Sequence, residues 1–199
     1  MDWVLVTMKL NLGCGYNKLE NYINIDHDAN CKPDIVADLE EDLPFMDSSI
    51  DEINMFHVLE HLGQSTKTYF SIWREFYRVL KDKGVIKITV PHWQHENFHH
   101  DPTHVRIVTP IGIDMFSQER NMYMIRTGGN ETTLGLQLGI DIGVTDVGYD
   151  FMPEFENAMK DKPRDIVMHE SKKYNNVCYQ VSIHAMAHKP GRGDTINNR

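Results

Sequence analysis

The sequence predicts an α/β fold built around a mostly parallel sheet, and three observations lead to that prediction. A short apolar segment, Lys9–Leu12, runs without a spacer into the closely spaced glycines of Gly13–Gly15. Further strand-like segments follow up to residue 91, and a stretch with helical apolar spacing lies between two of them. Several of these segments end in a carboxylate or a histidine, where open α/β sheets bind their ligands.

Length and composition indicate one globular domain. The 199 residues predict a domain over 8–188, preceded by an extension at 1–7 and followed by a polar, disordered tail at 189–199. The net charge of −9 argues against nucleic acid and anionic membranes as partners. Three cysteines form no disulfide framework and fit a reducing, cytoplasmic location. No apolar run is long enough to span a membrane.

The glycine turn and the next strand predict a nucleotide-type site. Glycines let a ligand approach the backbone closely, and the strand over 22–26 ends in Asp26, whose carboxylate can accept hydrogen bonds from both ribose hydroxyls. Asp26 follows Gly15 by 11 residues, which is shorter than the spacing of about 20 in dinucleotide-binding units. The turn also lacks a third glycine, because Lys18 stands there. Both facts disfavour an NAD enzyme and leave room only for a short first helix.

The third and fourth strands, predicted over 35–37 and 50–56, add further polar groups at the same edge. Asp38 and Leu39 follow the third strand, so the carboxylate can accept an adenine amino group while the Leu39 N–H meets a ring nitrogen. A plain solvated acidic loop is the alternative. His57 follows the fourth strand and begins the sequence His57-Val58-Leu59-Glu60-His61, which matches the H-x-x-E-H zinc-peptidase pattern. That pattern belongs inside a helix, so we expect no metal and assign these histidines to lining the site or to packing.

The later elements alternate between helix and strand. Apolar spacing predicts a helix over 65–80 and a strand over 85–90 that ends at Pro91. Pro110 begins a short helix over 109–118, and a Gly/Thr-rich loop or hairpin follows at 126–135. We expect a strand within 137–150, a helix over 153–173 that is interrupted at Pro163, and a last strand over 177–187.

Five of the eleven histidines lie directly after the fifth strand, at 92, 95, 99, 100 and 104. Three roles are open for this loop: a metal site, a loop that moves protons and anchors a substrate, or a polar loop whose rings bond to backbone. The spacing matches no zinc pattern. His104 and Arg106 are two residues apart and share a face in an extended segment, so one can take a proton while the other holds an anion. The predicted catalytic residues are therefore His104, His92 and Arg106.

These motifs, taken in order, resemble the class I S-adenosylmethionine-dependent methyltransferases. LNLGCG is similar to the first motif of that family, NID to its ribose-binding acid, and ADLEEDLPF to its adenine loop. SIDEINMFHVLEH and LKDKGVIKITVPH resemble its fourth-motif and fifth-strand regions. The resemblance spans about residues 8–92 and implies a three-layer, Rossmann-like, seven-stranded sheet whose last strand is antiparallel. Asn11, where the family usually has an acid, and Asn17, where it has a small residue, depart from the pattern.

The resemblance also implies a cofactor and a reaction. The cofactor is S-adenosyl-L-methionine, held by Asn11, Leu12, Gly13, Cys14, Gly15, Asp26, Asp38, Leu39, Phe56 and His57. The expected reaction is O- or N-methylation of a small-molecule or saccharide acceptor. The alternative is a non-catalytic protein of the same fold that binds the cofactor or a nucleotide. A related transferase, such as an aminopropyl transferase or a nucleic-acid methyltransferase, comes third. The sequence names neither the acceptor nor the oligomeric state.

Overall fold

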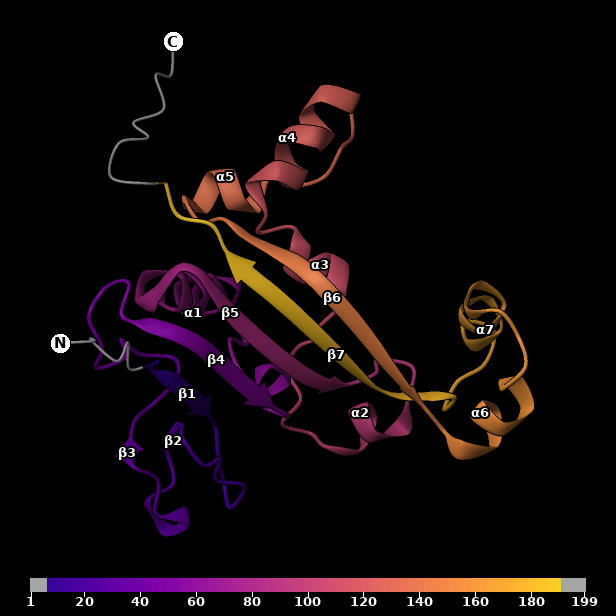
Figure 1. The fold of residues 1–199 in the computed structure, drawn as a ribbon, viewed down its shortest axis with the longest axis horizontal. Coiled ribbons are helices and arrows are strands. Elements are labelled where there is room, and N and C mark those ends of the chain that lie inside the picture. The colour runs from indigo at the N-terminus through magenta and orange to yellow at the C-terminus, as the bar shows by residue number, and fades with distance from the viewer. Residues whose placement is uncertain (1–6, 191–199) are drawn as a thin grey trace, which may run out of the picture.

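The computed structural model of the chain describes residues 7–190 (Figure 1). The predicted extension up to residue 6 and the predicted tail from residue 191 lie outside the described residues. Lys189, the first residue of that tail, is held in place, because its N–H donates to Asp82 at 2.9 Å and its ammonium donates to Ser48 at 2.9 Å. No helix within residues 7–190 is both long and apolar enough to cross a bilayer.

Seven strands form one sheet in the order β3-β2-β1-β4-β5-β7-β6. They are β1 Lys9–Leu12, β2 Ile23–Asp26, β3 Ile35–Val36, β4 Ile50–Phe56, β5 Leu80–Pro91, β6 Ile142–Phe151 and β7 Cys178–Ala187. The first five strands run parallel to one another, whereas β7 runs antiparallel to both of its neighbours, β5 and β6. The mostly parallel sheet with an antiparallel last strand is thereby confirmed.

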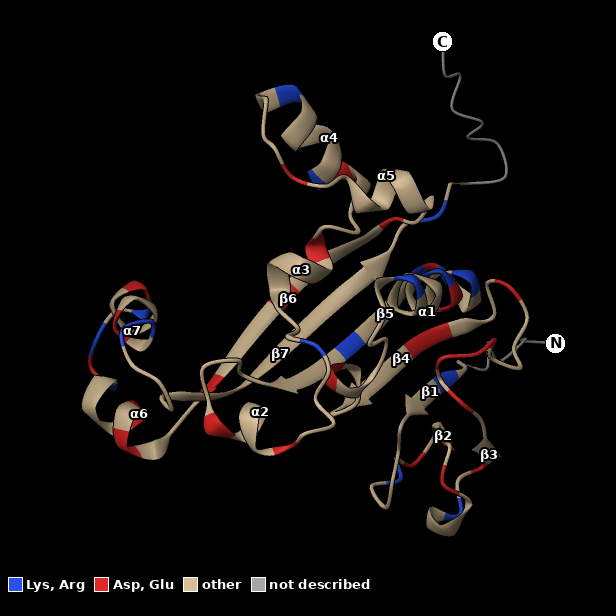
Figure 2. Ribbon diagram, turned by 180° about the vertical axis from the view of Figure 1, so that it is seen from behind, with Lys and Arg blue, Asp and Glu red and all other residues tan. Residues whose placement is uncertain are grey.

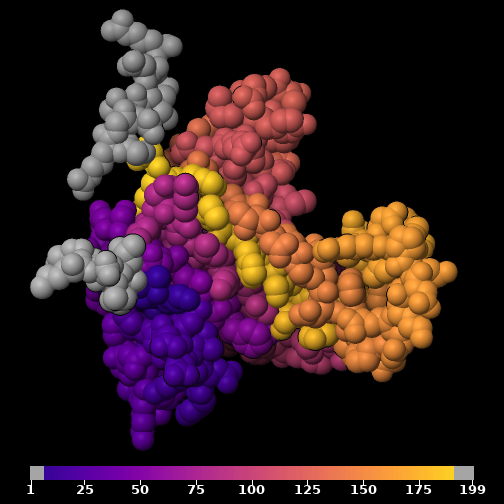
Figure 3. All heavy atoms as spheres, viewed as in Figure 1, coloured from indigo at the N-terminus to yellow at the C-terminus, as the bar shows by residue number. Residues whose placement is uncertain are grey.

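Within residues 7–190, all the α-helices come after β4 in the sequence. They are α1 Thr66–Val79, α2 Glu96–His100, α3 Pro110–Asp114, α4 Gln118–Thr127, α5 Leu134–Leu138, α6 Pro153–Met159 and α7 Arg164–Ser171. Two short 3-10 helices, η1 Ala29–Cys31 and η2 Leu59–His61, follow β2 and β4. Figure 3 shows α4 and the α6–α7 pair projecting from the body of the molecule.

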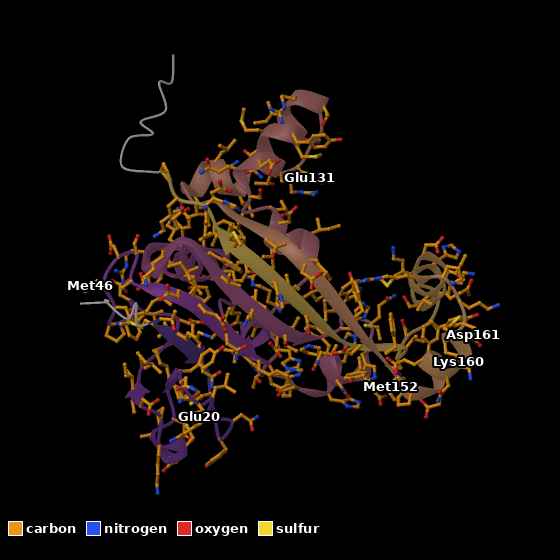
Figure 4. The ribbon with its side chains drawn as sticks, in the orientation of Figure 1. Glu20, Met46, Glu131, Met152, Lys160 and Asp161 are labelled. Carbon is orange, nitrogen blue, oxygen red and sulfur yellow. The ribbon has the colours of Figure 1, made fainter. Side chains whose placement is uncertain are left out.

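Three sequence predictions between residues 109 and 150 differ from the structure in their bounds. The short helix expected over 109–118 is α3, which ends at Asp114, and α4 begins separately at Gln118, where the Ser117 side chain accepts the Arg120 N–H. The loop expected over 126–135 contains the ends of α4 and α5, and Glu131 (labelled in Figure 4) pairs with Arg120 at 2.8 Å beside α4. The strand expected within 137–150 is β6, Ile142–Phe151, and the residues before it belong to the end of α5, which Gly139 terminates with φ 68°.

The two faces of the sheet differ in polarity. Along β1, β4 and β5, alternate residues such as Leu12, Met55 and Ile88 are buried and pack on α1. The intervening residues are polar, and they belong to a face that includes Lys9, Asn11, Asn24, Glu52, Asn54, Lys87, Thr89, Ser182 and His184. Figure 1 looks onto this polar face; Figure 2, from behind, shows α1 and α3 on the other side.

The helices therefore do not sandwich the sheet over β1, β4 and β5. Within residues 7–190, α1 and α3 cover the apolar face, and no helix covers the polar face of these three strands (Figure 1). The resemblance implied three layers, and here the outer layer on that side is missing. The physical reason is the alternation itself, since a face of polar side chains needs no apolar cover. The short first helix expected between β1 and β2 is likewise replaced by turns.

Hydrogen bonds stabilise the polar face from within. The Asn11 amide nitrogen donates to Asn24 Oδ1 and to the Asn17 carbonyl, both at 3.0 Å, and its oxygen accepts from Asn54 at 3.0 Å. Lys87 pairs with Glu52 at 2.9 Å on the neighbouring strand. The acidic segment of β4 and the basic segment of β5 are visible side by side in Figure 2. This network satisfies polar groups that would otherwise be costly to bury.

An aromatic cluster joins α1 to the segment after α3. The ring of Trp73 stacks on Phe116 with centroids 4.6 Å apart and meets Phe76 at 5.9 Å, and all three side chains are fully buried. These contacts attach the region after β5 to the core, which places residues 101–109 beside η2.

We expect Phe116→Ala to lower the free energy of unfolding by about 3–5 kcal/mol, because it leaves a cavity against the Trp73 ring. Urea denaturation followed by far-UV circular dichroism measures the change. Tyr123→Ala is the matched control, since Tyr123 is 57% exposed on α4. Equal losses from the two variants would contradict the assignment of Phe116 to the core.

Candidate functional site

The carboxyl ends of β1, β2 and β4 meet at one edge of the sheet and enclose a pocket of about 430 Å³. Its wall is made of Gly13, Asp26, His27, Asp38, Leu39, His57, Val58, His61, Leu62 and Thr103. Four different strand ends and the loop after β5 contribute to it. This is the position at which open α/β sheets bind ligands.

The glycine turn after β1 forms one side of this pocket. Gly13 has φ +61°, and a Cβ built on it would lie 2.5 Å from a methyl carbon of Val58. Gly15 also has a positive φ, +49°, but nothing lies within 4 Å of the place where its Cβ would be. Gly13 is therefore required by the packing of Val58, while Gly15 leaves space at the surface of the turn.

Asp26 closes the turn from the end of β2. One carboxylate oxygen accepts the Gly15 N–H at 2.7 Å, and the other accepts the Asp28 N–H at 2.9 Å. The residue is only 7% exposed. Two backbone donors thus fix the carboxylate in one orientation, and each oxygen keeps a further acceptor site.

The loop after β3 forms the next part of the wall. Asp38 is exposed and accepts the Glu40 N–H at 2.9 Å, whereas Leu39 is 7% exposed. Within residues 7–190, no residue accepts a hydrogen bond from the Leu39 N–H. Glu40 in turn accepts the Gly63 N–H at 2.7 Å, which ties this loop to the segment after η2. An unpaired backbone donor therefore stands beside an exposed carboxylate.

His57 lies where β4 ends, with φ 55°. Its Nε2 lies 3.0 Å from Gln180 Oε1, and its Nδ1 lies 3.3 Å from Glu60 Oε1. The Glu60 carboxylate raises the pKa of His57 above its usual value, against the opposing effect of burial. The pocket therefore contains an imidazole whose protonated form is favoured.

The comparisons with known proteins agree with this geometry. Residues 10–88 match the sequence model of a family described as a methyltransferase domain. They include the glycine turn, Asp26, the loop after β3 and the end of β4. Over this part of the chain the sequence is similar to that methyltransferase domain, and the mostly parallel sheet with an antiparallel seventh strand agrees with the resemblance.

Solved structures show the same fold. A S-adenosylmethionine-dependent methyltransferase from Archaeoglobus fulgidus is similar with a TM-score of 0.56 and 18% identity, over 92% of this chain and 86% of that one. A putative S-adenosylmethionine-dependent methyltransferase from Listeria monocytogenes is similar with a TM-score of 0.52 and 15% identity, over 92% of this chain and 91% of that one. At these identities the likeness is one of fold. No curated protein matches the chain.

Five of the ten predicted cofactor residues line the pocket, namely Gly13, Asp26, Asp38, Leu39 and His57. Gly15 adjoins it through its hydrogen bond to Asp26. The other four lie elsewhere: Leu12 is buried in the core, Cys14 is buried behind the turn, Asn11 bonds within the polar face, and Phe56 is half exposed beside the His57 ring.

The three predicted catalytic residues are not brought together. The Arg106 guanidinium lies 3.8 Å above the Tyr69 ring, donates to the Gly63 carbonyl at 2.6 Å, and lines a second cavity of about 330 Å³. His104 instead packs on His61, with ring centroids 4.6 Å apart. The expectation that His104 and Arg106 face one site assumed an extended segment with both side chains on one face, whereas the two side chains contact different partners, the His61 and Tyr69 rings.

His92 is a structural residue in this arrangement. It is 6% exposed, stacks on Trp93 with centroids 3.9 Å apart, and accepts the Gln94 N–H at 3.2 Å. Burial, helped by the neighbouring His95, lowers the pKa of His92 to about 4. His95 and His99 also bond to nearby backbone groups. Most histidines of this loop thus bond to backbone groups, which is the third of the three roles that the sequence left open.

Sequence reasoning missed Val58, Leu62, Thr103 and His27 in the pocket wall. The signal for the first two was their place directly after β4, at the same edge as the other strand ends. Thr103 comes from the loop after α2 and reaches the pocket by bonding to His61 Nδ1 at 2.9 Å. No local sequence pattern predicts this contact, because Thr103 and His61 are far apart in the sequence.

We expect Gly13→Ala to lower both stability and cofactor affinity, because the added methyl group displaces Val58 and the backbone stays at positive φ. Gly15→Ala meets only the backbone strain of about 1–2 kcal/mol, so it is the matched control. Thermal unfolding and calorimetric titration with S-adenosylhomocysteine measure both effects. A Gly13→Ala variant that matches Gly15→Ala in both would contradict the role given to Val58.

The low pKa of His92 predicts a defined loss of stability in acid. The pKa is about 4 in the folded protein and 6.5 in the reference state, so between these values the unfolded chain takes up a proton that the folded chain does not. Stability therefore falls as the pH drops from 6.5 to 4. His92→Phe, which keeps an aromatic ring beside Trp93, should make this decline shallower by about one proton. Parallel curves for the two proteins in urea denaturation at several pH values would count against the buried, neutral imidazole.

Proposed function

We propose that this protein transfers the methyl group of S-adenosylmethionine to an oxygen or nitrogen atom of a small-molecule or saccharide acceptor. The observation that carries the proposal is the convergence of Gly13, Asp26, Asp38, Leu39 and His57 on one pocket. Their chemistry suits a nucleoside: Asp26 for the ribose hydroxyls, Asp38 for the adenine amino group, and the Leu39 N–H for a ring nitrogen. Val58 and Leu62 supply apolar surface for the base.

The same pocket has groups that suit an acceptor. S-adenosylmethionine, when bound, supplies a methyl group already activated by the sulfonium, so the protein has to align the acceptor and exclude water. His57, His61 and Thr103 line the wall beside the carboxylates. The imidazole of His57, in its neutral form, can take the proton that an alcohol or amine acceptor releases. His57 replaces His92 and His104 as the candidate base, because it lines the pocket and they do not.

The surroundings of the pocket favour a small, uncharged or cationic acceptor. Asp26 and Asp38 line it, and Glu60 lies behind His57. These acidic residues, together with the net charge of −9 of the whole chain, repel a phosphate backbone. Nucleic acid is accordingly the less favoured acceptor.

One observation favours the alternative of a cofactor-binding protein without turnover. Between β1 and β2 the described chain forms turns, where the resemblance predicts a helix. The cofactor is then covered on that side only by a turn, and solvent reaches it more readily. A screen of hydroxylated and amino acceptors, read by release of S-adenosylhomocysteine, separates the two functions. Tight binding without release above the background rate, for every acceptor tried, would favour the non-catalytic protein.

We expect Asp26→Ala to weaken S-adenosylhomocysteine binding at least 10-fold, because each hydrogen bond to a carboxylate contributes about 1.5–3 kcal/mol. Isothermal titration calorimetry measures the affinity, and thermal unfolding verifies that the variant is folded. Asp42→Ala is the control, since Asp42 is an exposed acid of the neighbouring loop outside the pocket wall. A folded Asp26→Ala variant with the affinity of the control would remove Asp26 from the cofactor site.

A further inference from the structure

The carboxylate of Glu60 is buried without a hydrogen-bond partner. Glu60 lies in η2 with 0% of its surface exposed, and neither of its side-chain oxygens accepts a hydrogen bond from the described residues. The nearest basic group is the His57 ring, whose Nδ1 lies 3.3 Å from Oε1. A buried carboxylate in this state is costly unless a cation compensates it.

Two further histidines converge on this carboxylate. One ligand atom each from Glu60, His61 and His104 lies within 4.8 Å of the other two. His61 Nδ1 bonds to Thr103 Oγ1 at 2.9 Å, and His104 Nδ1 bonds to the Phe98 carbonyl at 2.7 Å. These bonds orient both rings through Nδ1, which is the usual arrangement around a metal-bound histidine. Each Nε2 then makes no hydrogen bond to the described residues, and His104 Nε2 lies 4.0 Å from Asp101 Oδ2.

The backbone holds the three residues together although they are far apart in the sequence. The Glu60 carbonyl accepts the N–H groups of Val105 and Arg106 at 2.9 and 3.2 Å. Residues 104–106 are therefore attached to η2 whether or not a cation is present. The donor set is preformed by the fold.

We propose that Glu60, His61 and His104 bind a divalent transition-metal ion. One carboxylate and two imidazoles are a donor set that suits such ions and leaves coordination positions open. Ligand atoms about 2.1 Å from a common ion lie about 3–3.5 Å apart, so side-chain adjustments of an ångström or so close the site. The ion adds positive charge beside the buried Glu60 carboxylate, whose nearest basic group is the His57 ring.

This site is distinct from the H-x-x-E-H peptidase pattern that the sequence formally matches. There, both histidines of the pattern bind the metal from one helix. Here His57 bonds to Gln180 at the end of β4, and His104 from the loop after α2 takes the third position. The long-range contact, rather than the local pattern, makes the site.

A second cluster, Cys14, Asp26 and Cys31, also brings its ligand atoms close together. It contains no carboxylate without a hydrogen-bond partner. The Asp26 carboxylate already accepts two backbone N–H groups, and the Cys31 thiol donates to the Asp28 carbonyl at 2.9 Å. Burial raises the pKa of Cys14 to about 11, which disfavours the thiolate that a metal needs. This contrast singles out the Glu60 cluster.

The position suggests what the ion does. His61 and Thr103 also line the pocket, so the open coordination positions lie beside it. An ion there would bind and orient an oxygen atom of the acceptor, which narrows the acceptor to an oxygen ligand such as a hydroxylated compound. This last step rests on the proposed function, whereas the metal site itself does not.

Cobalt is a suitable probe, because its visible absorption reports coordination directly. Protein without a histidine tag is stripped with a chelator, dialysed, and titrated with Co²⁺ in an absorption spectrometer and a calorimeter. We expect one equivalent to bind in the wild-type protein and in His100→Gln, an exposed histidine of the same loop outside the cluster. Glu60→Gln and His104→Gln should each bind at least 10-fold more weakly.

Thermal unfolding provides the check on folding, since Co²⁺ should raise the Tm of the wild type and of His100→Gln but not of His104→Gln. If Glu60→Gln does not fold, His61→Gln replaces it in the series. A wild-type protein that binds no Co²⁺, or a folded His104→Gln variant that binds as tightly as His100→Gln, would overturn the site. Titration with S-adenosylhomocysteine in the same samples keeps the two proposals apart, because cofactor binding can persist when the metal site fails.

Discussion

The fold and the site both depend on the close approach between the turn after β1 and the residue that follows His57. Val58 occupies the space where a side chain at Gly13 would stand. A Cβ at Gly13 would lie only 2.5 Å from a methyl carbon of Val58, which is closer than van der Waals contact allows. The ends of β1 and β4 can therefore lie side by side, as their parallel pairing requires. Asp26 then fixes the next residue of the turn by accepting the Gly15 N–H. Two short-range constraints thus bring three strand ends to one pocket.

Much of this arrangement could be predicted from the sequence. Alternation in β4, with Ile53 and Met55 on one face and Glu52 and Asn54 on the other, defines both the strand and its orientation. Strand-end reasoning then found Gly13, Asp26, Asp38, Leu39 and His57, because the carboxyl ends of parallel strands share an edge. The sequence was less informative between residues 109 and 141, where capping by Ser117 and the turn at Gly139 decide the boundaries of α4 and α5.

Long-range contacts explain the remaining differences in the site. Asn11 was expected to reach the cofactor, but its amide is engaged by Asn17, Asn24 and Asn54 across the polar face. Arg106 and His104 were expected to cooperate, but the Tyr69 ring holds the first and the His61 ring holds the second. Glu60 was set aside because its sequence pattern demands a helix. In each case the deciding partner lies outside the local sequence.

The most direct test of the account is a crystal structure of the protein with S-adenosylhomocysteine. The account predicts that the ribose hydroxyls lie within hydrogen-bond distance of the Asp26 carboxylate, and that the adenine ring lies between Val58 and the loop of Asp38 and Leu39, with a ring nitrogen on the Leu39 N–H. A nucleoside bound elsewhere, for example in the cavity beside Arg106, with Asp26 still bonded only to Gly15 and Asp28, would contradict it.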